Sequence, residues 1–215
     1  MSDAHDAAGA DAAAYWEERY AGAGPVWSGR VNTVLATVAA TLPAGTALDL
    51  GCGEGGDAVW LAEQGWTVTA VDISPTAIAR GEAAARDRGL GPDRLRFVTA
   101  DLATFGTDAS FSLITACFLH SPGMLDRVAV LRRAAGFVEP GGHLLLISHA
   151  APPPWATRLH EHRAELLPPG QDLARLALDP TAWETVICEV RRREAVGPDG
   201  TAAALDDGVI LLRRR

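Results

Sequence analysis

The stretch Ala47-Leu-Asp-Leu-Gly-Cys-Gly-Glu-Gly-Gly56 decides the fold of this chain. Its apolar start ends at Leu50, glycines then dominate the next six residues, and an apolar segment over residues 57–63 follows. This order predicts a β-strand, a tight turn and a helix. Glycine allows the backbone to bend sharply and to approach a ligand closely. We therefore expect N–H groups at the start of the helix to point at a bound molecule.

A second apolar run, residues 66–71, ends in Asp72 about twenty residues further on. An acidic residue at the tip of the second strand of a doubly wound fold is placed to bind the hydroxyl groups of a ribose. A carboxylate suits this task because it can accept hydrogen bonds from two adjacent hydroxyls at once. The two stretches together predict a nucleoside-binding site.

The composition limits the classes of protein that fit. The chain of 215 residues can bury a full core as one domain. Its net charge of −8 provides no global basic field for nucleic acid or anionic lipid. All 19 basic residues are arginine, which excludes Schiff-base lysines and the phosphate-loop lysine. Three distant cysteines, no charged-then-apolar leader and no long uncharged apolar stretch predict a cytoplasmic protein without a disulfide framework.

Strand-like and helix-like segments alternate along most of the chain. A parallel sheet with helices on both faces follows from this alternation. Residues 183–192 and 203–212, separated by Gly197-Pro-Asp-Gly200, are typical of an antiparallel hairpin. We predict an α/β fold with a Rossmann-like, doubly wound, mostly parallel seven-stranded sheet that ends in this hairpin. The expected strands before the hairpin are 47–50, 67–71, 95–98, 111–116 and 143–147, and the expected helices are 31–41, 57–64, 75–88, 124–138, 158–167 and 172–178.

The expected domain organisation is simple. Residues 1–14 lack a periodic apolar face and should form a flexible start, and residues 15–215 should form a single domain. Within it, residues 15–42 are expected to be an N-terminal flap and helix. Residues 150–180 interrupt the alternation and are expected to form a lid over the substrate. The alternative for this last segment is a helix pair that packs on the sheet edge.

Four motifs together resemble the class I S-adenosylmethionine-dependent methyltransferases, of the type that acts on small molecules. They are Leu48-Asp-Leu-Gly-Cys-Gly-Glu-Gly55, the acid in Val71-Asp-Ile-Ser-Pro75, the acid in Thr99-Ala-Asp-Leu102, and the Pro140-Gly-Gly turn before the fifth strand. The resemblance covers about residues 44–148 by motif and the closing hairpin by architecture. It implies S-adenosylmethionine as cofactor and transfer of its methyl group to a small-molecule acceptor.

The resemblance also implies roles for single residues along the cofactor. Gly51, Cys52 and Gly53 would line its methionine and ribose, with Asp49 near the amino group. Asp72 would bind the ribose hydroxyls, and Ile73 would pack on the adenine. The remaining contacts would come from Asp101 to the adenine amino group, from the backbone N–H of Leu102, and from Cys117 beside the methionine tail. Asp101 as a turn or cap residue and Cys117 as a small packing residue are the alternatives.

Aromatic residues before the first strand suggest a cover for the cofactor. Trp16 and Tyr20 are four apart and share a helix face, and Trp27 follows a Gly/Pro break. The pattern is similar to the flap of thiopurine-type and tellurite-resistance-type methyltransferases. It implies that Trp16 and Tyr20 cover the cofactor tail and that Trp27 lies near the methyl group, where an aromatic face favours a cationic sulfonium. Alternatively, these side chains only pin the segment to the core.

Two histidines are candidates for a general base. His120 follows the fourth strand and His149 follows the fifth, both at the carboxyl edge where ligands bind in this architecture. A protein base is needed only if the acceptor is protonated at the working pH, so both side chains could instead only shape the pocket. The acceptor site is expected to comprise Trp27, His120, His149, Trp155 and Arg158. No metal site is expected, because His160 and His162 lie two apart on a presumed helix and do not share a face.

Two other functions are compatible with the glycine pattern. Gly51, Gly53 and Gly56 also match the G-x-G-x-x-G spacing of nicotinamide-dependent oxidoreductases, but Asp49 would crowd a bound pyrophosphate and no lysine is present for the usual catalytic pairs. The other alternative is a sensor or scaffold that binds S-adenosylmethionine without turnover. The expected partner is a small-molecule acceptor and neither nucleic acid nor a membrane, with the protein a monomer or homodimer.

Overall fold

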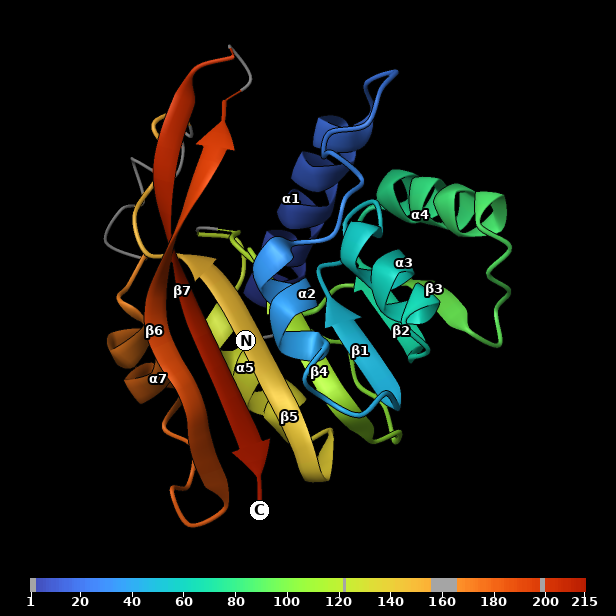
Figure 1. Ribbon diagram of the computed structural model, residues 1–215. Helices are drawn as coiled ribbons and strands as arrows, with labels where there is room; N and C mark the ends of the chain where they lie inside the picture. Colours follow the sequence, from blue (N-terminus) through green and yellow to red (C-terminus); the bar gives the residue numbers. More distant parts are fainter. Residues whose placement is uncertain (1–2, 122, 156–165, 198–199) are drawn as a thin grey trace.

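The computed structural model describes residues 3–121, 123–155, 166–197 and 200–215 (Figure 1). Its centre is a seven-stranded sheet with the strand order β3-β2-β1-β4-β5-β7-β6. Only β7 runs antiparallel to its neighbours. The predicted fold class is confirmed. The strands are β1 (Thr46–Leu50), β2 (Thr67–Asp72), β3 (Leu95–Thr99), β4 (Phe111–Cys117), β5 (Val138–His149), β6 (Trp183–Val196) and β7 (Ala202–Arg214).

Helices cover both faces of the sheet because the central strands are apolar on both sides. One core contains α2 (Thr33–Ala39), α3 (Gly56–Glu63) and part of α4 (Pro75–Asp87), packed on alternate strand residues such as Ala47 and Leu145. The other contains α5 (Arg127–Ala135) and α7 (Pro169–Leu176), packed on the intervening residues. Figure 1 shows these two layers on opposite sides of β4 and β5. The parallel strands therefore end at one edge, where the candidate site lies.

Local sequence explains where several helices begin. Ser74 accepts a hydrogen bond from the N–H of Ala77 and Pro75 occupies the first turn of α4, as an N-cap followed by proline predicts. Asn32 caps α2 and Asp126 caps α5 in the same way. These caps place the helix starts within three residues of the expected positions.

The N-terminal helix is longer than expected. The helix α1 runs from Asp3 to Tyr20, so residues 3–14, which were expected to be an irregular start, belong to it. The physical reason is the alanine content of this stretch, because alanine has the highest helix propensity even without an apolar face. Among the described residues, no helix has the length and apolarity needed to cross a membrane.

The closing hairpin extends beyond the rest of the sheet. β5 and β7 pair from His143↔Arg213 to His149↔Asp207, whereas β6 and β7 continue to pair as far as Val196↔Ala202. The far end of the hairpin consequently projects past the carboxyl end of β5, as Figure 1 shows. The register places Asp207 opposite His149, at the edge where the candidate site lies.

Candidate cofactor and acceptor site

The glycine turn after β1 is shaped by its own hydrogen bonds. The N–H groups of Gly51 and Cys52 both donate to the carbonyl of Val71, at 2.8 and 3.0 Å. The N–H of Gly53 donates to Asp72 Oδ2 at 2.8 Å. Each of these three N–H groups therefore has a protein acceptor. The expectation that N–H groups at the start of α3 face the ligand concerns later residues and stays a prediction. What the three turn residues can present is carbonyl oxygens and the bare Cα surface, which suit a cationic ligand.

Two of these glycines have a backbone conformation that side chains rarely adopt, and both are closely approached by other residues. Gly51 has φ +70°, and a Cβ there would lie 2.8 Å from Leu119 Cδ1. Gly53 has φ +53°, and a Cβ there would lie 3.0 Å from the Tyr20 hydroxyl oxygen. Both conformations are left-handed and disfavour side chains. The turn is thus covered closely by side chains from outside the motif.

Asp72 lies at the end of β2, as predicted, and is almost fully buried. Its Oδ1 accepts from the N–H of Ser74 at 3.0 Å, while Oδ2 accepts from Gly53. Burial raises the pKa of Asp72, and these backbone hydrogen bonds lower it in part. Each carboxylate oxygen can accept a further bond, so the geometry leaves capacity for two ribose hydroxyls.

A buried acidic group lies beneath the turn. Asp49 accepts a hydrogen bond from Thr115 Oγ1 at 2.7 Å, and burial, reinforced by the charge of Asp57, raises the pKa of Asp49 to about 7. Asp57 accepts from the N–H of Asn32 at 2.6 Å and from the thiol of Cys117, and burial raises its pKa. No arginine of the described chain forms an ion pair with Asp49 or Asp57. The site accordingly contains carboxylates that lack a protein cation.

The thiols of Cys52 and Cys117 are buried, and burial raises the pKa of both well above the ordinary range. Neither is a thiolate at neutral pH. Cys117 ends β4 next to the acidic group and packs against the core, as the alternative has it, while its place beside the methionine tail stays a prediction.

The residues expected around the adenine lie after β2 and β3. Asp101 Oδ1 accepts from the N–H of Ala103 at 2.8 Å, so the turn role of Asp101 is present in the structure. The side chain of Leu102 points into the core, and its carbonyl accepts from Arg133. Ile73 is half-buried beside Asp72. The side chain of Leu102 is thus not available to a ligand, and the predicted contact from its backbone N–H stays a prediction.

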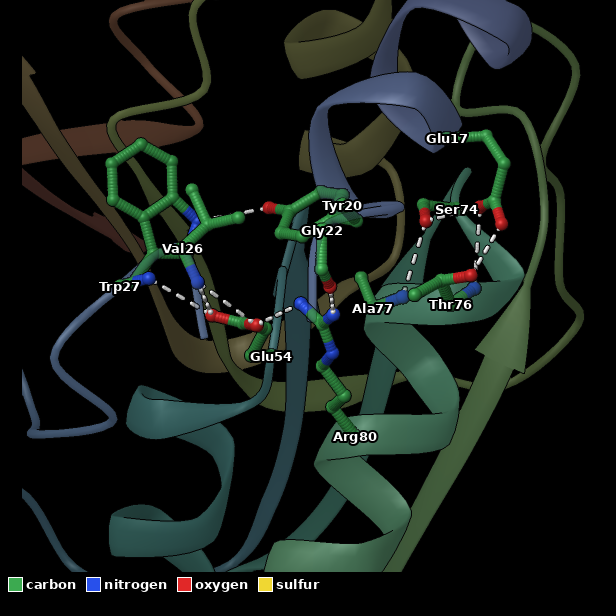
Figure 2. Close-up of polar contacts among 10 residues, drawn as sticks. All are labelled: Glu17, Tyr20, Gly22, Val26, Trp27, Glu54, Ser74, Thr76, Ala77 and Arg80. Atoms are coloured by element: carbon green, nitrogen blue, oxygen red, sulfur yellow. Dashed lines mark hydrogen bonds and ion pairs between the residues drawn. The ribbon is translucent and has the colours of Figure 1, made fainter. Parts of the chain in front are cut away.

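Two of the N-terminal aromatic residues, Tyr20 and Trp27, lie beside Gly53 of the glycine turn (Figure 2). Trp27 Nε1 donates to the Tyr20 hydroxyl at 2.9 Å, and Trp16 Nε1 donates to Ser121 Oγ at 3.1 Å. Burial raises the pKa of Tyr20, so its hydroxyl stays protonated. Trp27 is half-exposed, with the guanidinium of Arg19 over its ring at 5.2 Å. The flap predicted from sequence therefore contacts the turn after β1 and the end of β4.

Three charged residues that sequence reasoning missed hold this flap in place (Figure 2). Glu54, inside the glycine motif, accepts from the N–H groups of Val26 and Trp27 and forms an ion pair with Arg80 at 2.8 Å. Glu17 on α1 accepts from Ser74 Oγ at 2.6 Å and from Thr76 at the start of α4. These hydrogen bonds lower the pKa of Glu17. The one available signal was a glutamate between glycines, Gly53-Glu-Gly55.

The two candidate bases lie side by side. The rings of His120 and His149 stack with centroids 5.5 Å apart, and His120 Nε2 accepts the backbone N–H of His149 at 3.2 Å. Burial lowers the pKa of His120 to about 3. His149 Nδ1 lies 3.2 Å from Oδ1 of the fully buried Asp207, which also pairs with Arg193. Sequence reasoning missed Asp207 and Arg193, because no local motif marks them.

The segment expected to form a lid is described only in part. Arg158 lies outside the described residues, as do the first eight residues of the expected helix 158–167, and Trp155 is half-buried. The second expected helix is α7, which packs against α5 and does not cover the edge of the sheet: Arg127 pairs with Asp172 at 2.7 Å, and Arg132 donates to the carbonyl of Leu176. This helix packs on the sheet, with Leu176 buried in the core, while the lid over residues 150–180 stays a prediction.

The residues at the edge fit S-adenosylmethionine chemically. Its ribose needs acceptors, which Asp72 supplies, and its ammonium and sulfonium groups need negative or electron-rich surroundings. The cation-free carboxylates of Asp49 and Asp57, the carbonyls of the turn and the ring of Tyr20 supply them. A dianionic pyrophosphate would meet the same carboxylates unfavourably. These acidic and electron-rich groups thus favour a nucleoside that carries positive charge.

Comparison with known proteins agrees with this chemistry. A family model described as a methyltransferase domain matches residues 47–142. The chain is 30% identical over 168 residues to the probable thiol methyltransferase 2 of Arabidopsis thaliana. This match covers 72% of each protein. It is 35% identical over 114 residues to the 2-heptyl-1-hydroxyquinolin-4(1H)-one methyltransferase of Mycobacteroides abscessus. That match covers 51% of this chain and only 49%, about half, of the relative.

One solved structure extends the likeness to nearly the whole chain. It comes from work on the conversion of a disulfide bond into a thioacetal group during echinomycin biosynthesis. The TM-score is 0.67 at 27% sequence identity, and the alignment covers 94% of this chain and 90% of the other. The similarity therefore includes the N-terminal flap and the closing hairpin, beyond the family model.

Proposed function

We propose that this chain, which belongs to the class I S-adenosylmethionine-dependent methyltransferases and uses S-adenosylmethionine as its cofactor, transfers the methyl group to a small-molecule acceptor. The bound cofactor supplies a methyl group activated by a positively charged sulfur. The task of the protein is to hold the acceptor in line with that group and to exclude water. Such positioning can lower the barrier by roughly 7–11 kcal/mol.

The observation that carries this proposal is the absence of a cation beside the buried carboxylates under the glycine turn, among the residues that the structure describes. Burying unpaired carboxylates is costly, and the raised pKa of Asp49 reflects that cost. A ligand with two positive groups removes the cost. Asp72 then selects the ribose, and Tyr20 and Trp16 close the pocket from the flap.

A small acceptor is supported by the flap and by the relatives. Trp16 is tied to Ser121 and Trp27 to Tyr20, so the edge of the sheet is covered by aromatic side chains and not by a basic face. Related proteins are named for a hydroxyquinolone and for thiols. The acceptor pocket that we propose is bounded by Trp27, His120 and His149, with Trp155 and Arg158 contributed by the following segment.

The test combines binding and turnover on purified protein. Calorimetry with S-adenosylmethionine and with NAD should show binding of the first alone. When S-adenosylmethionine with an isotope-labelled methyl group is used, the label should then appear in at least one of three acceptors. These are 2-heptyl-1-hydroxyquinolin-4(1H)-one, catechol and hydrogen sulfide. Tight binding without transfer to any acceptor would favour a sensor, and binding of NAD in place of S-adenosylmethionine would end the proposal.

A further inference from the structure

The C-terminal hairpin contributes a buried charge to the acceptor side of the site. Asp207 on β7 is fully buried and lies 3.2 Å from His149 Nδ1 through Oδ1. Its other oxygen, Oδ2, accepts from Arg193 Nε on β6 at 2.5 Å. The guanidinium of Arg193 in turn lies 5.5 Å from the ring of Phe118, which stacks on His149 at 4.4 Å. These contacts join β4, β5, β6 and β7 around one imidazole.

The contacts determine which nitrogen of His149 carries the proton. Asp207 Oδ2 accepts from the guanidinium of Arg193, so Asp207 presents its oxygens to His149 as acceptors. His149 must then donate from Nδ1, which leaves the lone pair on Nε2. His149 Nε2 has no hydrogen bond to any residue within the described ranges, and the ring is held between Phe118 and His120. An oriented imidazole with a free Nε2 is the geometry of a general base.

His120 is excluded from that role by its own contacts. Its Nε2 accepts the backbone N–H of His149, so the lone pair needed to take up a proton is already engaged. Arg127 on α5 adds a positive charge on the other side of His120. The groups that face the pair are thus Asp207 and Arg193 from the hairpin, Arg127 from α5, and Phe118 as an uncharged wall. Of the two histidines, only His149 can exchange a proton with an acceptor.

We propose that His149 accepts the proton of an acceptor hydroxyl through Nε2, and that Asp207 and Arg193 are positioning residues that hold its ring and balance the charge that it gains. This inference rests on the proposed function and narrows it to acceptors that are protonated at neutral pH. The acceptor O–H bond breaks and its proton goes to Nε2. The oxygen bonds to the methyl carbon, and the electrons of the methyl–sulfur bond remain on sulfur, which becomes neutral.

Methyl transfer to two kinds of probe tests the role of His149. Catechol keeps its proton at neutral pH, whereas hydrogen sulfide is already partly ionised to a soft anion that needs no base. His149→Gln should reduce kcat with catechol at pH 7 by about 100-fold or more, with little change in KM, and the loss should shrink as the pH approaches ionisation of catechol. Transfer to hydrogen sulfide should change little. His143→Gln, at the opposite end of β5, is the matched control.

The positioning residues are tested by a readout that does not need turnover. Long-range nitrogen–proton NMR on histidine-labelled protein should show His149 as the Nδ1–H tautomer. Asp207→Asn keeps the shape but can donate, so it should shift His149 toward the Nε2–H tautomer and reduce kcat with catechol about tenfold or more. If Asp207→Asn does not fold, Arg193→Gln is the substitute, because Arg193 lies on the more exposed strand β6. It should reduce kcat with catechol by a smaller factor.

The outcomes separate this inference from the proposed function. An Nε2–H tautomer in the unmodified protein would overturn the inference with or without activity. Full catechol methylation by His149→Gln, or transfer to hydrogen sulfide alone, would overturn it as well while leaving the methyltransferase function intact. Loss of S-adenosylmethionine binding in the unmodified protein would instead contradict the proposed function.

Discussion

Two buried aspartates at the same edge of the sheet have opposite surroundings. Asp49, at the end of β1, is only 2% exposed, accepts a hydrogen bond from Thr115, and has the acidic Asp57 and Asp72 as its charged neighbours. Asp207, on β7, is 0% exposed, but it is paired with Arg193 and bonded to His149. The two side chains are therefore about equally buried, but only Asp207 has a positively charged partner.

The difference between them indicates what each half of the site acts on. The acids of the half around β1 and β2 form no ion pair within the described residues, which fits the cationic cofactor that we propose there. In the half around β5 and β7, Asp207 is already paired with Arg193, which fits the proton exchange that we propose for His149. A buried charge without a partner is costly, whereas a paired one orients its neighbours.

The largest effect is expected when the uncompensated charge is removed. The pKa of Asp49 is about 7 in the folded protein against an ordinary 3.8. Between these values the folded protein keeps a proton that the unfolded chain has released, so stability falls as the pH rises, and the full cost is present above pH 7. Asp49→Asn should therefore stabilise the ligand-free protein by about 2–4 kcal/mol at pH 8 and by little near pH 4.

Urea denaturation at both pH values measures this gain. Asp87→Asn, an exposed acid at the end of α4, is the control and should show no such pH-dependent gain. If Asp49→Asn lost stability at pH 8, the carboxylate of Asp49 would be compensated after all, and the contrast with Asp207 would disappear. The same variant should bind S-adenosylmethionine more weakly, since the stabilised site lacks the charge that the ligand matches.

The next effect concerns the ribose. Asp72→Ala removes the acceptor of two hydroxyls and leaves the N–H groups of Gly53 and Ser74 without their side-chain acceptor. A charge-assisted hydrogen bond is worth about 1.5–3 kcal/mol, so affinity for S-adenosylmethionine should fall by roughly tenfold or more. Calorimetry measures the change against Asp87→Ala. Equal affinity in the Asp72 variant would remove this carboxylate from the site.

The sequence was informative where contacts are local. The path from Gly51 to Ser74 is one strand-turn-helix-strand unit, so a glycine cluster and an acid twenty residues later predicted both the turn and Asp72. The caps at Asn32, Ser74 and Asp126 act within three residues. The alternation of strands and helices and the antiparallel hairpin also followed, because turns and alternation are properties of neighbouring residues.

The sequence was uninformative where contacts depend on register. His149 and Asp207 are 58 positions apart and meet only because β5 and β7 pair at that one step; a shift by one residue would turn Asp207 to the other face. Glu54 lies inside the glycine motif, but nothing in that motif indicates its partners Val26 and Trp27, which lie 28 and 27 positions earlier. The N–H groups of Gly51 and Cys52 donate to the carbonyl of Val71, which lies on another strand, so the local sequence did not reveal these hydrogen bonds.

A further test addresses acid stability on the balanced side. The pKa of His120 is about 3 against an ordinary 6.5, because the neutral ring is buried. As the pH falls through this window, the unfolded chain gains a proton that the folded protein does not bind, so stability is lost. When the pH is lowered from 8 to 5, the free energy of unfolding of the unmodified protein should fall by about 2 kcal/mol more than that of His120→Gln. His143 is half-exposed, so His143→Gln should change the stability lost between pH 8 and pH 5 by a smaller amount. If the unmodified protein, His120→Gln and His143→Gln all lost the same stability, the ring of His120 would not be buried in its neutral form.

The smallest expected effect tests how the flap is held against the acidic half. Glu54→Gln retains one acceptor oxygen for Val26 and Trp27 but loses the ion pair with Arg80 and the second acceptor. The pair is mostly buried, so we expect a loss of about 1 kcal/mol in stability. Trypsin should cleave faster after the exposed Arg30, because the flap opens more often. Glu63→Gln is the matched control: its pair with Arg88 is exposed and should contribute almost nothing. If bound S-adenosylmethionine protected Arg30 in the Glu63 variant but not in the Glu54 variant, Glu54 would couple flap closure to the cofactor. If the cofactor protected Arg30 from trypsin equally in both variants, Glu54 would contribute to the stability of the fold and not to the coupling between flap and cofactor.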